Sequence, residues 1–293
     1  MKKLNGVSTA LITPFTANGM VDEEGLGVLI ERQISADVKG ICVTAGSGEF
    51  ANTTTEEHAL VVKLAVKYAD GRVPIIAGVF ACSTADALVA SKKACSLGAD
   101  ALLVLSPLYN RPSPDGMKLY YKTIAEGVDK PVLIYNNSGR TGVDIASLYK
   151  SFHDIDNIIG IKECNRDMGV FSETILNMSD KWNSILSGDE DIFYPHLCLG
   201  GHGAIMTTSN IAPKPWVELY TAFMVGDHAR AVKIHYSMLP LLNAVYTLNH
   251  PSLVKKCMVM MGLPAGAARS PLMEPTREQI DRIAEVIEKM SLK

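Results

Sequence analysis

Eight short apolar runs recur along the chain, and longer amphipathic segments lie between most of them. Runs of this length that are predominantly apolar are typical of strands in a parallel sheet, because helices cover both faces of such a sheet. Several of the amphipathic segments open with acidic residues or Ser/Thr and close on Gly, as helices do. The runs are residues 7–13, 40–45, 73–78, 101–106, 131–136, 158–163, 184–188 and 203–208.

This rhythm predicts the fold. Eight strand-then-helix units over about 225 residues favour a (β/α)8 barrel, which belongs to the α/β class. A doubly wound sheet is less favoured, because its G-x-G-x-x-G turn would follow the first strand, where residues 13–19 read TPFTANG instead. The segments after residue 227 have a purely helical pattern. We therefore expect a catalytic barrel over residues 1–226 and a C-terminal helical region over residues 227–293 that packs on it.

Composition excludes several classes of partner. The net charge is −3 and the isoelectric point is about 6.2, so no electrostatic case exists for binding nucleic acid or a membrane surface. No run of about 18 apolar residues is present, which predicts no membrane span. The first apolar run is interrupted by Ser8, Thr9, Thr13 and Pro14, so it does not read as a signal peptide.

The cysteine and histidine patterns point away from disulfides and metals. Six cysteines are scattered without a C-x-x-C pair, which favours reduced thiols in a cytoplasmic protein. The seven histidines show neither H-x-H nor H-x-x-x-H spacing. We expect no metal, although a zinc site assembled from distant residues stays open.

A barrel places its active site at the carboxyl ends of the strands, and the run 158–163 ends there on Lys162. One explanation is a buried ion pair with Glu163, Asp189 or Glu190. The other is a nucleophile: desolvation penalises the ammonium form, and a partly neutral amine can attack a carbonyl carbon.

Other polar residues follow neighbouring strands. Tyr135 and Tyr109 could shuttle protons near the amine, or could be packed aromatic side chains. Ser47, in the glycine-rich turn 46–49, could hold a carboxylate together with backbone N–H groups, or the segment could be only a tight turn. Arg140 could bind a second carboxylate or form a structural salt bridge.

Taken together, the motifs at the strand ends resemble those of the pyruvate-dependent lyase family that includes dihydrodipicolinate synthase and N-acetylneuraminate lyase. The similarity covers nearly the whole chain and keeps the family's order and spacing. It implies a class I mechanism in an enzyme that needs no cofactor. The motifs are TPF, GSGEF, SPLYNRPS, YNNSGRTG, IIGIKE, LSGDE and GGHGAI.

The resemblance also implies roles for single residues. Lys162 would form a Schiff base with the keto carbon of pyruvate or of another 2-keto acid, and Tyr135 would relay protons. Tyr109 would lend its phenol to the site of a neighbouring subunit, so a homodimer or homotetramer is implied. Ile205 would contact the bound pyruvate through its main chain.

The turn after the second run agrees with the family's pattern at Ser47 and departs from it at Gly46. The resemblance implies that Ser47, with the adjacent amides of Gly46 and Gly48, grips the pyruvyl carboxylate. The synthases have two adjacent threonines here, and Gly46 lacks the hydroxyl that links their two tyrosines. A glycine at this position resembles the sugar-acid dehydratase branch, whereas Arg140 resembles the synthases. Phe80 also departs from the family's pattern.

These features leave several activities open. Condensation of pyruvate with an aldehyde, as in the dihydrodipicolinate synthases, is favoured. A 2-keto-3-deoxy sugar-acid aldolase or dehydratase is the alternative, and an N-acetylneuraminate lyase is less favoured because no sugar-binding residues are evident in residues 136–142. A non-catalytic protein that senses a 2-keto acid would have no need of Lys162, Tyr135 and Ser47. One enamine site can serve condensation, cleavage or dehydration, and the second substrate decides which of them takes place.

Overall fold

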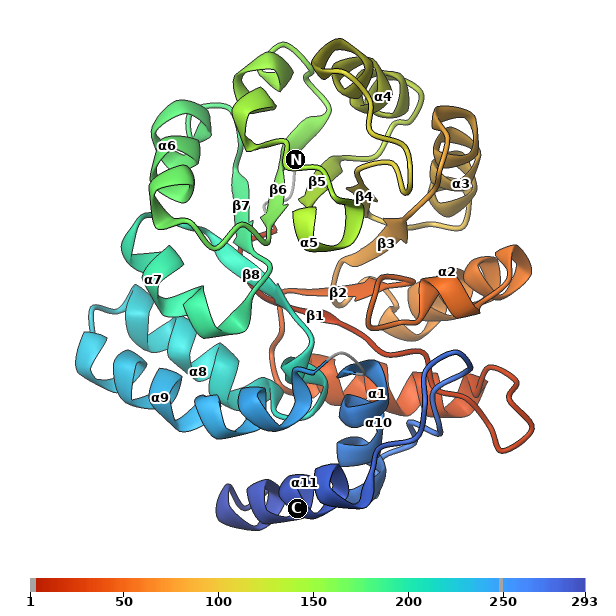
Figure 1. Cartoon of the computed structure of the whole chain (residues 1–293), viewed down its shortest axis with the longest axis vertical. Coiled ribbons are helices and arrows are strands. Elements are labelled where there is room, and N and C mark those ends of the chain that lie inside the picture. The colour runs from red at the N-terminus through yellow and green to blue at the C-terminus, as the bar shows by residue number, and fades with distance from the viewer. Residues whose placement is uncertain (1–3, 248–249, 293) are drawn as a thin grey trace.

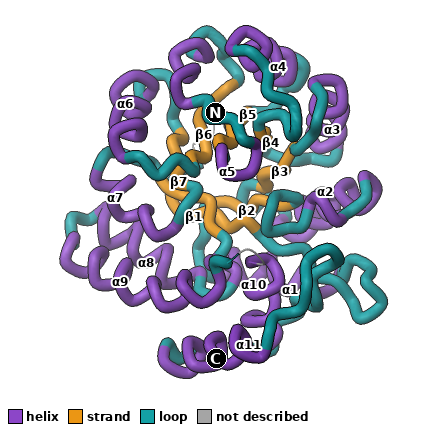
Figure 2. Tube along the Cα trace, viewed as in Figure 1, coloured by secondary structure: helices purple, strands orange, loops and turns teal. Residues whose placement is uncertain are grey.

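The computed structural model describes residues 4–247 and 250–292, and its centre is a closed barrel of eight parallel strands surrounded by helices (Figures 1 and 2). Each strand pairs with the next along the chain, and β8 pairs with β1 to close the barrel. The predicted (β/α)8 fold is therefore confirmed. The strands are β1 (Gly6–Ala10), β2 (Gly40–Val43), β3 (Ile75–Val79), β4 (Ala101–Leu105), β5 (Val132–Asn136), β6 (Ile158–Glu163), β7 (Ser184–Ser187) and β8 (Gly203–Met206).

Some strands end earlier than the apolar runs do. β2 ends at Val43 because Thr44 has a φ of 55°, which no strand residue adopts. β8 ends at Met206 because the backbone N–H groups of Thr207 and Thr208 donate to the carboxylate of Glu190 instead of to a neighbouring strand. The ends of these runs are thus free to form the loops at the mouth of the barrel.

Helices follow seven of the strands much as expected, and side-chain caps fix several of their starts. Thr54 and Glu57 form a capping box at the start of α2, and Asp22 and Ser83 cap α1 and α3. The helices around the barrel are α1 (Glu23–Ser35), α2 (Thr55–Ala69), α3 (Thr84–Ser96), α4 (Pro114–Glu126), α6 (Met168–Met178), α7 (Phe193–Cys198) and α8 (Pro213–Met224).

The unit after β5 differs from the others. Instead of one long helix it contains the short α5 (Ser138–Thr141) and a 3-10 helix, η2 (Ala146–Phe152). Gly142 has a φ of 70° and ends α5 after one turn. This break leaves a polar loop over the mouth of the barrel, and Figure 1 shows α5 close to the barrel axis.

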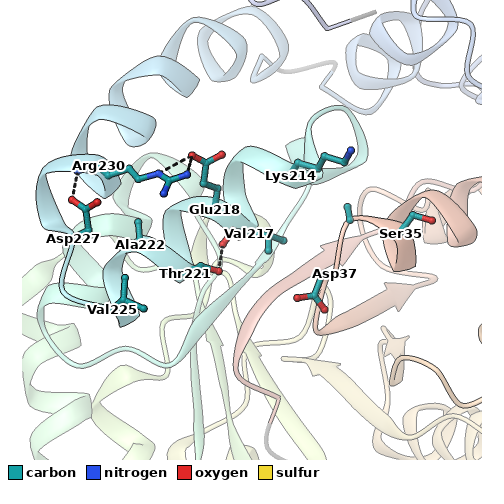
Figure 3. A pocket seen from close by; sticks show the side chains of 11 residues that line it. Ser35, Asp37, Lys214, Val217, Glu218, Thr221, Ala222, Val225, Asp227 and Arg230 are labelled. Atoms are coloured by element: carbon teal, nitrogen blue, oxygen red, sulfur yellow. Dashed lines mark hydrogen bonds and ion pairs between the residues drawn. The ribbon is translucent and has the colours of Figure 1, made fainter.

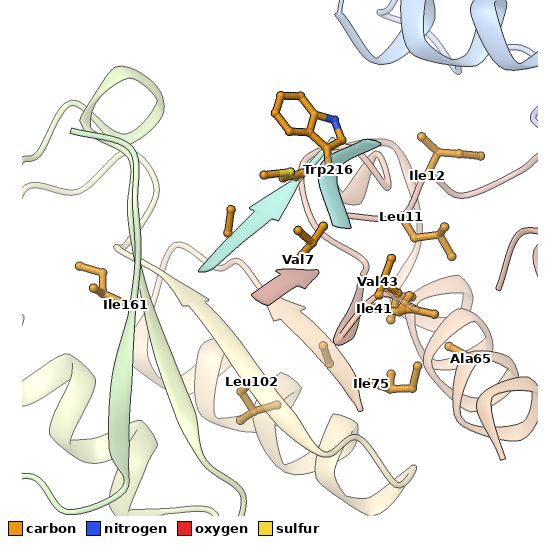
Figure 4. Close-up of a cluster of buried hydrophobic side chains, with 14 of the residues drawn as sticks. Val7, Leu11, Ile12, Ile41, Val43, Ala65, Ile75, Leu102, Ile161 and Trp216 are labelled. Atoms are coloured by element: carbon orange, nitrogen blue, oxygen red, sulfur yellow. The ribbon is translucent and has the colours of Figure 1, made fainter. Parts of the chain in front are cut away.

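Two cores are built from alternate residues of the same strands. On β4, Leu102 and Val104 face the helices, whereas Ala101 and Leu103 fill the barrel interior. Figure 4 shows the outer core, in which Leu102 packs with residues of neighbouring strands and helices. Tyr135 and Phe80 pack against the inner core.

Three further helices follow the barrel: α9 (His228–Val245), α10 (His250–Met260) and α11 (Arg277–Lys289). Their buried faces, which include Leu241, Leu253 and Ile283, belong to the same hydrophobic cluster as the outer core. The division of the chain at residue 226 stays a prediction. Among the residues that the structure describes, none of the helices has both the length and the apolar character needed to cross a membrane.

Candidate active site

Lys162 lies at the mouth of the barrel with its amine against a phenol ring. It is the second-to-last residue of β6 and lies in register with Tyr135 on β5. Its side chain is buried, at 5% exposure, and Nζ lies 4.6 Å from the centroid of the Tyr135 ring. The structure thus brings together the two residues to which the sequence assigned the chemistry.

Lys162 has no ion-pair partner among residues 4–247 and 250–292, so the alternative of a structural ion pair is not supported. Glu163 points to the opposite side of the sheet, as adjacent strand residues do, and accepts hydrogen bonds from Tyr149, Asn136 (3.0 Å) and the backbone of Asn165 (2.7 Å). Glu190 is likewise occupied by other partners. Asp189 forms its ion pair with Arg166, at 3.3 Å.

The surroundings of Lys162 favour its ammonium form in the free site, whereas the sequence suggested a partly neutral amine. Burial alone would lower the pKa of Lys162, but electrostatic interactions with Tyr135, Cys164, Cys42 and Asp189 together raise that pKa above its usual value. The amine is therefore an ammonium ion at neutral pH. The sequence could not predict this, because Tyr135, Cys42 and Asp189 come from other strand ends, and only Cys164 lies at the same end as Lys162.

Tyr135 is a neutral phenol positioned to donate a proton. Its Oη accepts a hydrogen bond of 3.0 Å from Asn137. Burial raises the pKa of Tyr135 to about 12, although the charge of Lys162 opposes this rise. The phenol therefore keeps its proton at neutral pH until a stronger base develops beside it.

Ser47 lies in a buried turn that links the ends of β2 and β8. Its Oγ lies 2.7 Å from Oγ1 of Thr207, and the carboxylate of Glu190 fixes Thr207 through its backbone N–H. The carbonyl of Gly48 accepts a hydrogen bond of 2.7 Å from Thr13. Thr13, Thr207 and Glu190 were not predicted as supports, because their contacts join residues far apart in the chain.

Gly46 differs from its neighbours in the turn. It is exposed, and a Cβ built on it would meet no atom within 4 Å. The missing hydroxyl therefore leaves open space, which no other side chain of the described protein fills.

Arg140 is exposed on α5 and forms no ion pair with any residue that the structure describes. The alternative of a structural salt bridge is thus unsupported. Burial lowers the pKa of His250 to about 4, with further lowering by the charges of Arg140 and Lys162. Both cations therefore act electrostatically on His250, the first residue of α10 (His250–Met260).

The two remaining predicted residues, Ile205 and Tyr109, differ in exposure: the first is buried and the second is exposed. Ile205 is fully buried in the inner core, against which Tyr135 also packs. Tyr109, in contrast, is 94% exposed and has a φ of 69°, and its side chain does not join the interior of its own chain.

An aromatic wall borders the site. The rings of Phe50 and Phe80 meet edge to face at a centroid distance of 4.4 Å, and Phe80 lies 5.9 Å from Tyr135. Phe80 is the residue that departs from the family's pattern, and the structure shows that it covers the inner core beside the reactive phenol. One side of the mouth is thus apolar.

A separate surface cavity of about 350 Å³ lies between the end of α1 and α8 (Figure 3). None of the predicted site residues lines it. Its cation Arg230 is paired with Glu218 at 2.7 Å and receives the cap of Asp227. Lys214 also lines the cavity, but no tyrosine is among its lining residues, so the lysine–phenol pair of the barrel mouth has no counterpart there. In residues 4–247 and 250–292, no group of three or more acidic, His or Cys side chains could hold a metal ion.

Comparison with known proteins agrees with this arrangement. The family model described as Dihydrodipicolinate synthetase family matches residues 3–290. A 4-hydroxy-tetrahydrodipicolinate synthase of Methanothrix thermoacetophila is 36% identical over 287 residues, which cover 98% of this chain and 97% of that protein. The synthase of Thermodesulfovibrio yellowstonii is 38% identical over 288 residues, with 98% of each protein covered. The crystal structure of dihydrodipicolinate synthase from Aquifex aeolicus superposes with a TM-score of 0.95 at 36% identity and covers 98% of each chain.

Proposed function

The chain belongs to the dihydrodipicolinate synthetase family, a family of class I lyases, and we propose that it condenses pyruvate with an aldehyde as a 4-hydroxy-tetrahydrodipicolinate synthase does. The observation that carries the proposal is the buried Lys162 amine at 4.6 Å from the Tyr135 ring centroid, at the carboxyl end of a closed barrel. A non-catalytic sensor would not require this pairing.

The chemistry follows from the two groups. Lys162 first loses a proton to solvent and its amine attacks the keto carbon of pyruvate; a second proton then passes from the nitrogen to the former keto oxygen, which gives a carbinolamine. Tyr135 donates a proton to the carbinolamine hydroxyl, which leaves as water, and an iminium ion remains. The Tyr135 phenolate then takes a proton from the methyl group, which gives an enamine, and the enamine carbon attacks the carbonyl carbon of the aldehyde. Tyr135 returns this proton to the aldehyde oxygen. Water hydrolyses the iminium, which releases the product and regenerates the Lys162 ammonium group, and Tyr135 recovers its proton from solvent.

Two carboxylate sites complete the proposal. Ser47 and the backbone N–H groups of Gly46 and Gly48 would hold the carboxylate of pyruvate, since a buried hydroxyl and turn amides suit an anion. Arg140, which is exposed and unpaired among the described residues, would bind the carboxylate of the aldehyde substrate. Ile205 would border bound pyruvate through its main chain.

The second candidate is a 2-keto-3-deoxy sugar-acid aldolase or dehydratase, which Gly46 favours. The aromatic wall of Phe50 and Phe80 argues against it, because neither ring can hydrogen-bond a polyhydroxylated chain. Arg140 also favours a carboxylated aldehyde.

The assembly and location are proposed on the same basis. Tyr109, exposed on its own chain, would reach the site of a neighbouring subunit in a homodimer or homotetramer. All six cysteines are free thiols, which is consistent with the cytoplasm. The reaction as written needs no metal or organic cofactor.

Borohydride trapping tests the proposal. The protein is incubated with pyruvate, reduced, and digested for mass spectrometry, and we expect a reduced pyruvyl adduct on Lys162 that Lys162→Ala abolishes. A coupled assay then compares aspartate semialdehyde with 2-keto-3-deoxy sugar acids. Absence of the adduct would reject the enzyme, and turnover of only the sugar acids would reject the synthase.

A further inference from the structure

A second buried lysine lies beneath the turn that carries Ser47. Lys255, on α10, is 1% exposed, and its Nζ lies 2.5 Å from Oε1 of Glu49, whose side chain is fully buried. Charged side chains are rarely buried unless they are paired. The pair joins the loop after β2 to the C-terminal helical region, and the reaction described above uses neither residue.

Residues from the C-terminal part of the chain contact both oxygens of the Glu49 carboxylate. The backbone N–H of Arg269 donates to Oε2 at 2.9 Å, and Asn52 donates to the same oxygen at 3.3 Å. Lys255 also donates to the carbonyl of Ala267, at 3.2 Å. The carboxylate therefore connects α10, the segment around residue 269 and the loop after β2.

The same two cations also contact the loop after β1. Nζ of Lys255 and Cζ of Arg269 each lie over the Phe15 ring, 4.0 Å from its centroid. Arg269 is in turn paired with Glu57 of α2 at 2.5 Å. The C-terminal cations thus converge on the two loops that border the carboxylate-binding turn.

The backbone of Glu49 connects its contacts with Lys255 and Arg269 to the turn that carries Ser47. Its φ of 57° is a left-handed conformation that a non-glycine residue holds only with support from its surroundings. Its backbone N–H donates to the carbonyl of Gly46 at 3.1 Å, which closes the turn around Ser47. A displacement of Glu49 would therefore move the Ser47 hydroxyl and the adjacent amides.

We propose that the Glu49–Lys255 pair is a positioning element for the carboxylate-binding turn, and that α10 thereby sets the affinity of the site for pyruvate. The inference rests on the proposed function, because it takes the Ser47 turn to bind the pyruvate carboxylate. Lys255 is not a second nucleophile. Burial lowers the pKa of Lys255 to about 8 against the opposing charge of Glu49, but the amine is enclosed and paired.

The test is borohydride trapping at a series of pyruvate concentrations, with Lys255→Met and Glu49→Gln. We expect the half-saturating pyruvate concentration to rise about tenfold, because small displacements of a binding group have large effects on affinity, while the trapping rate at saturation stays within about twofold. The half-saturating aldehyde concentration should not change. Lys256→Met, the same substitution at the next residue of α10, should behave as the wild type.

A double variant separates positioning from folding. Each single variant leaves a buried charge without its partner, whereas Glu49→Gln/Lys255→Met removes both charges and should melt close to the wild-type temperature. It should nevertheless keep the weakened pyruvate affinity. Wild-type affinity in the folded double variant, or its failure to fold, would overturn the inference. Failure of the wild type to form any adduct would instead reject the proposed function.

Discussion

Tyr135 combines a ring that packs beside the Lys162 amine with a hydroxyl that can move a proton, and one substitution separates the two. Tyr135→Phe keeps the ring at the amine and in the inner core but removes the donor. We expect turnover to fall about 10²- to 10⁴-fold, the usual contribution of general acid–base catalysis, with a stability loss of only about 1 kcal/mol from the lost Asn137 hydrogen bond. Steady-state kinetics and thermal melting measure both, and turnover within threefold of wild type would assign the proton relay to another group.

Gly46 is the second residue whose effect can be predicted separately. A Cβ there meets no atom within 4 Å, so the Cβ of Gly46→Thr has room, and the variant should raise the unfolding free energy by about 0.5 kcal/mol, through the less flexible unfolded chain. The added hydroxyl restores the group that links the tyrosines in the synthases. We expect condensation kcat to rise roughly threefold or more, while pyruvate trapping is unchanged. Gly46→Ala adds Cβ without a hydroxyl and is the control, and equal rates for the two variants would contradict the relay.

At the scale of single residues, the sequence predicted which side chains meet in the candidate site better than it predicted their charge states. Lys162 and Tyr135 were predictable as neighbours because both end apolar runs of a parallel barrel. The charge of Lys162 was not, because it depends on Tyr135, Cys42 and Asp189, which other strands bring near the amine, as well as on Cys164.

Among the elements, β5, β6 and η2 meet at a buried carboxylate that should make stability depend on pH. Burial raises the pKa of Glu163 to about 7, against the hydrogen bond from Tyr149. The folded protein thus keeps this proton up to about pH 7, whereas the unfolded chain releases it near 4.5. Because the folded state binds more protons between these values, its stability falls as the pH rises from about 4.5 to about 7, by about 3 kcal/mol.

Urea denaturation at pH 5 and pH 8 tests this dependence. Glu163→Gln cannot ionise, so we expect the difference between the two unfolding free energies to be smaller than in the wild type by about 3 kcal/mol. Glu173→Gln, on the exposed face of α6, is the matched control and should retain the wild-type difference. An unchanged difference in Glu163→Gln would show that another group titrates.

The strands were predictable as elements because a barrel buries both faces of each one, which leaves uninterrupted apolar runs in the sequence. Their ends were less predictable: Thr44 leaves β2 through its backbone conformation, and Thr207 leaves β8 to bind Glu190. The replacement of a helix by α5 and η2 was missed for a related reason. Gly142 has a φ of 70° and ends the helix after one turn, whereas an isolated glycine in a sequence does not by itself predict a helix end.

At the scale of the whole molecule, Tyr109 is the residue whose predicted role a single chain cannot fulfil. It is 94% exposed, so its side chain lies outside the interior of its own chain. Lys162, in contrast, is buried in the barrel. If Tyr109 completes the site of a neighbour, one active site takes its lysine and this tyrosine from two different chains.

Mixing two defective variants decides this point. Lys162→Ala and Tyr109→Phe are each expected to be nearly inactive. In a mixed dimer, the Tyr109→Phe chain keeps its own Lys162 and receives an intact tyrosine from the Lys162→Ala chain, so one of the two sites is complete. Half of the dimers are mixed after equal proportions are dissociated and reassembled, so activity should recover to about a quarter of the wild-type value, as the twofold symmetry requires. If Tyr109 served its own chain, every site in the mixture would lack either the lysine or the tyrosine, and no activity would return.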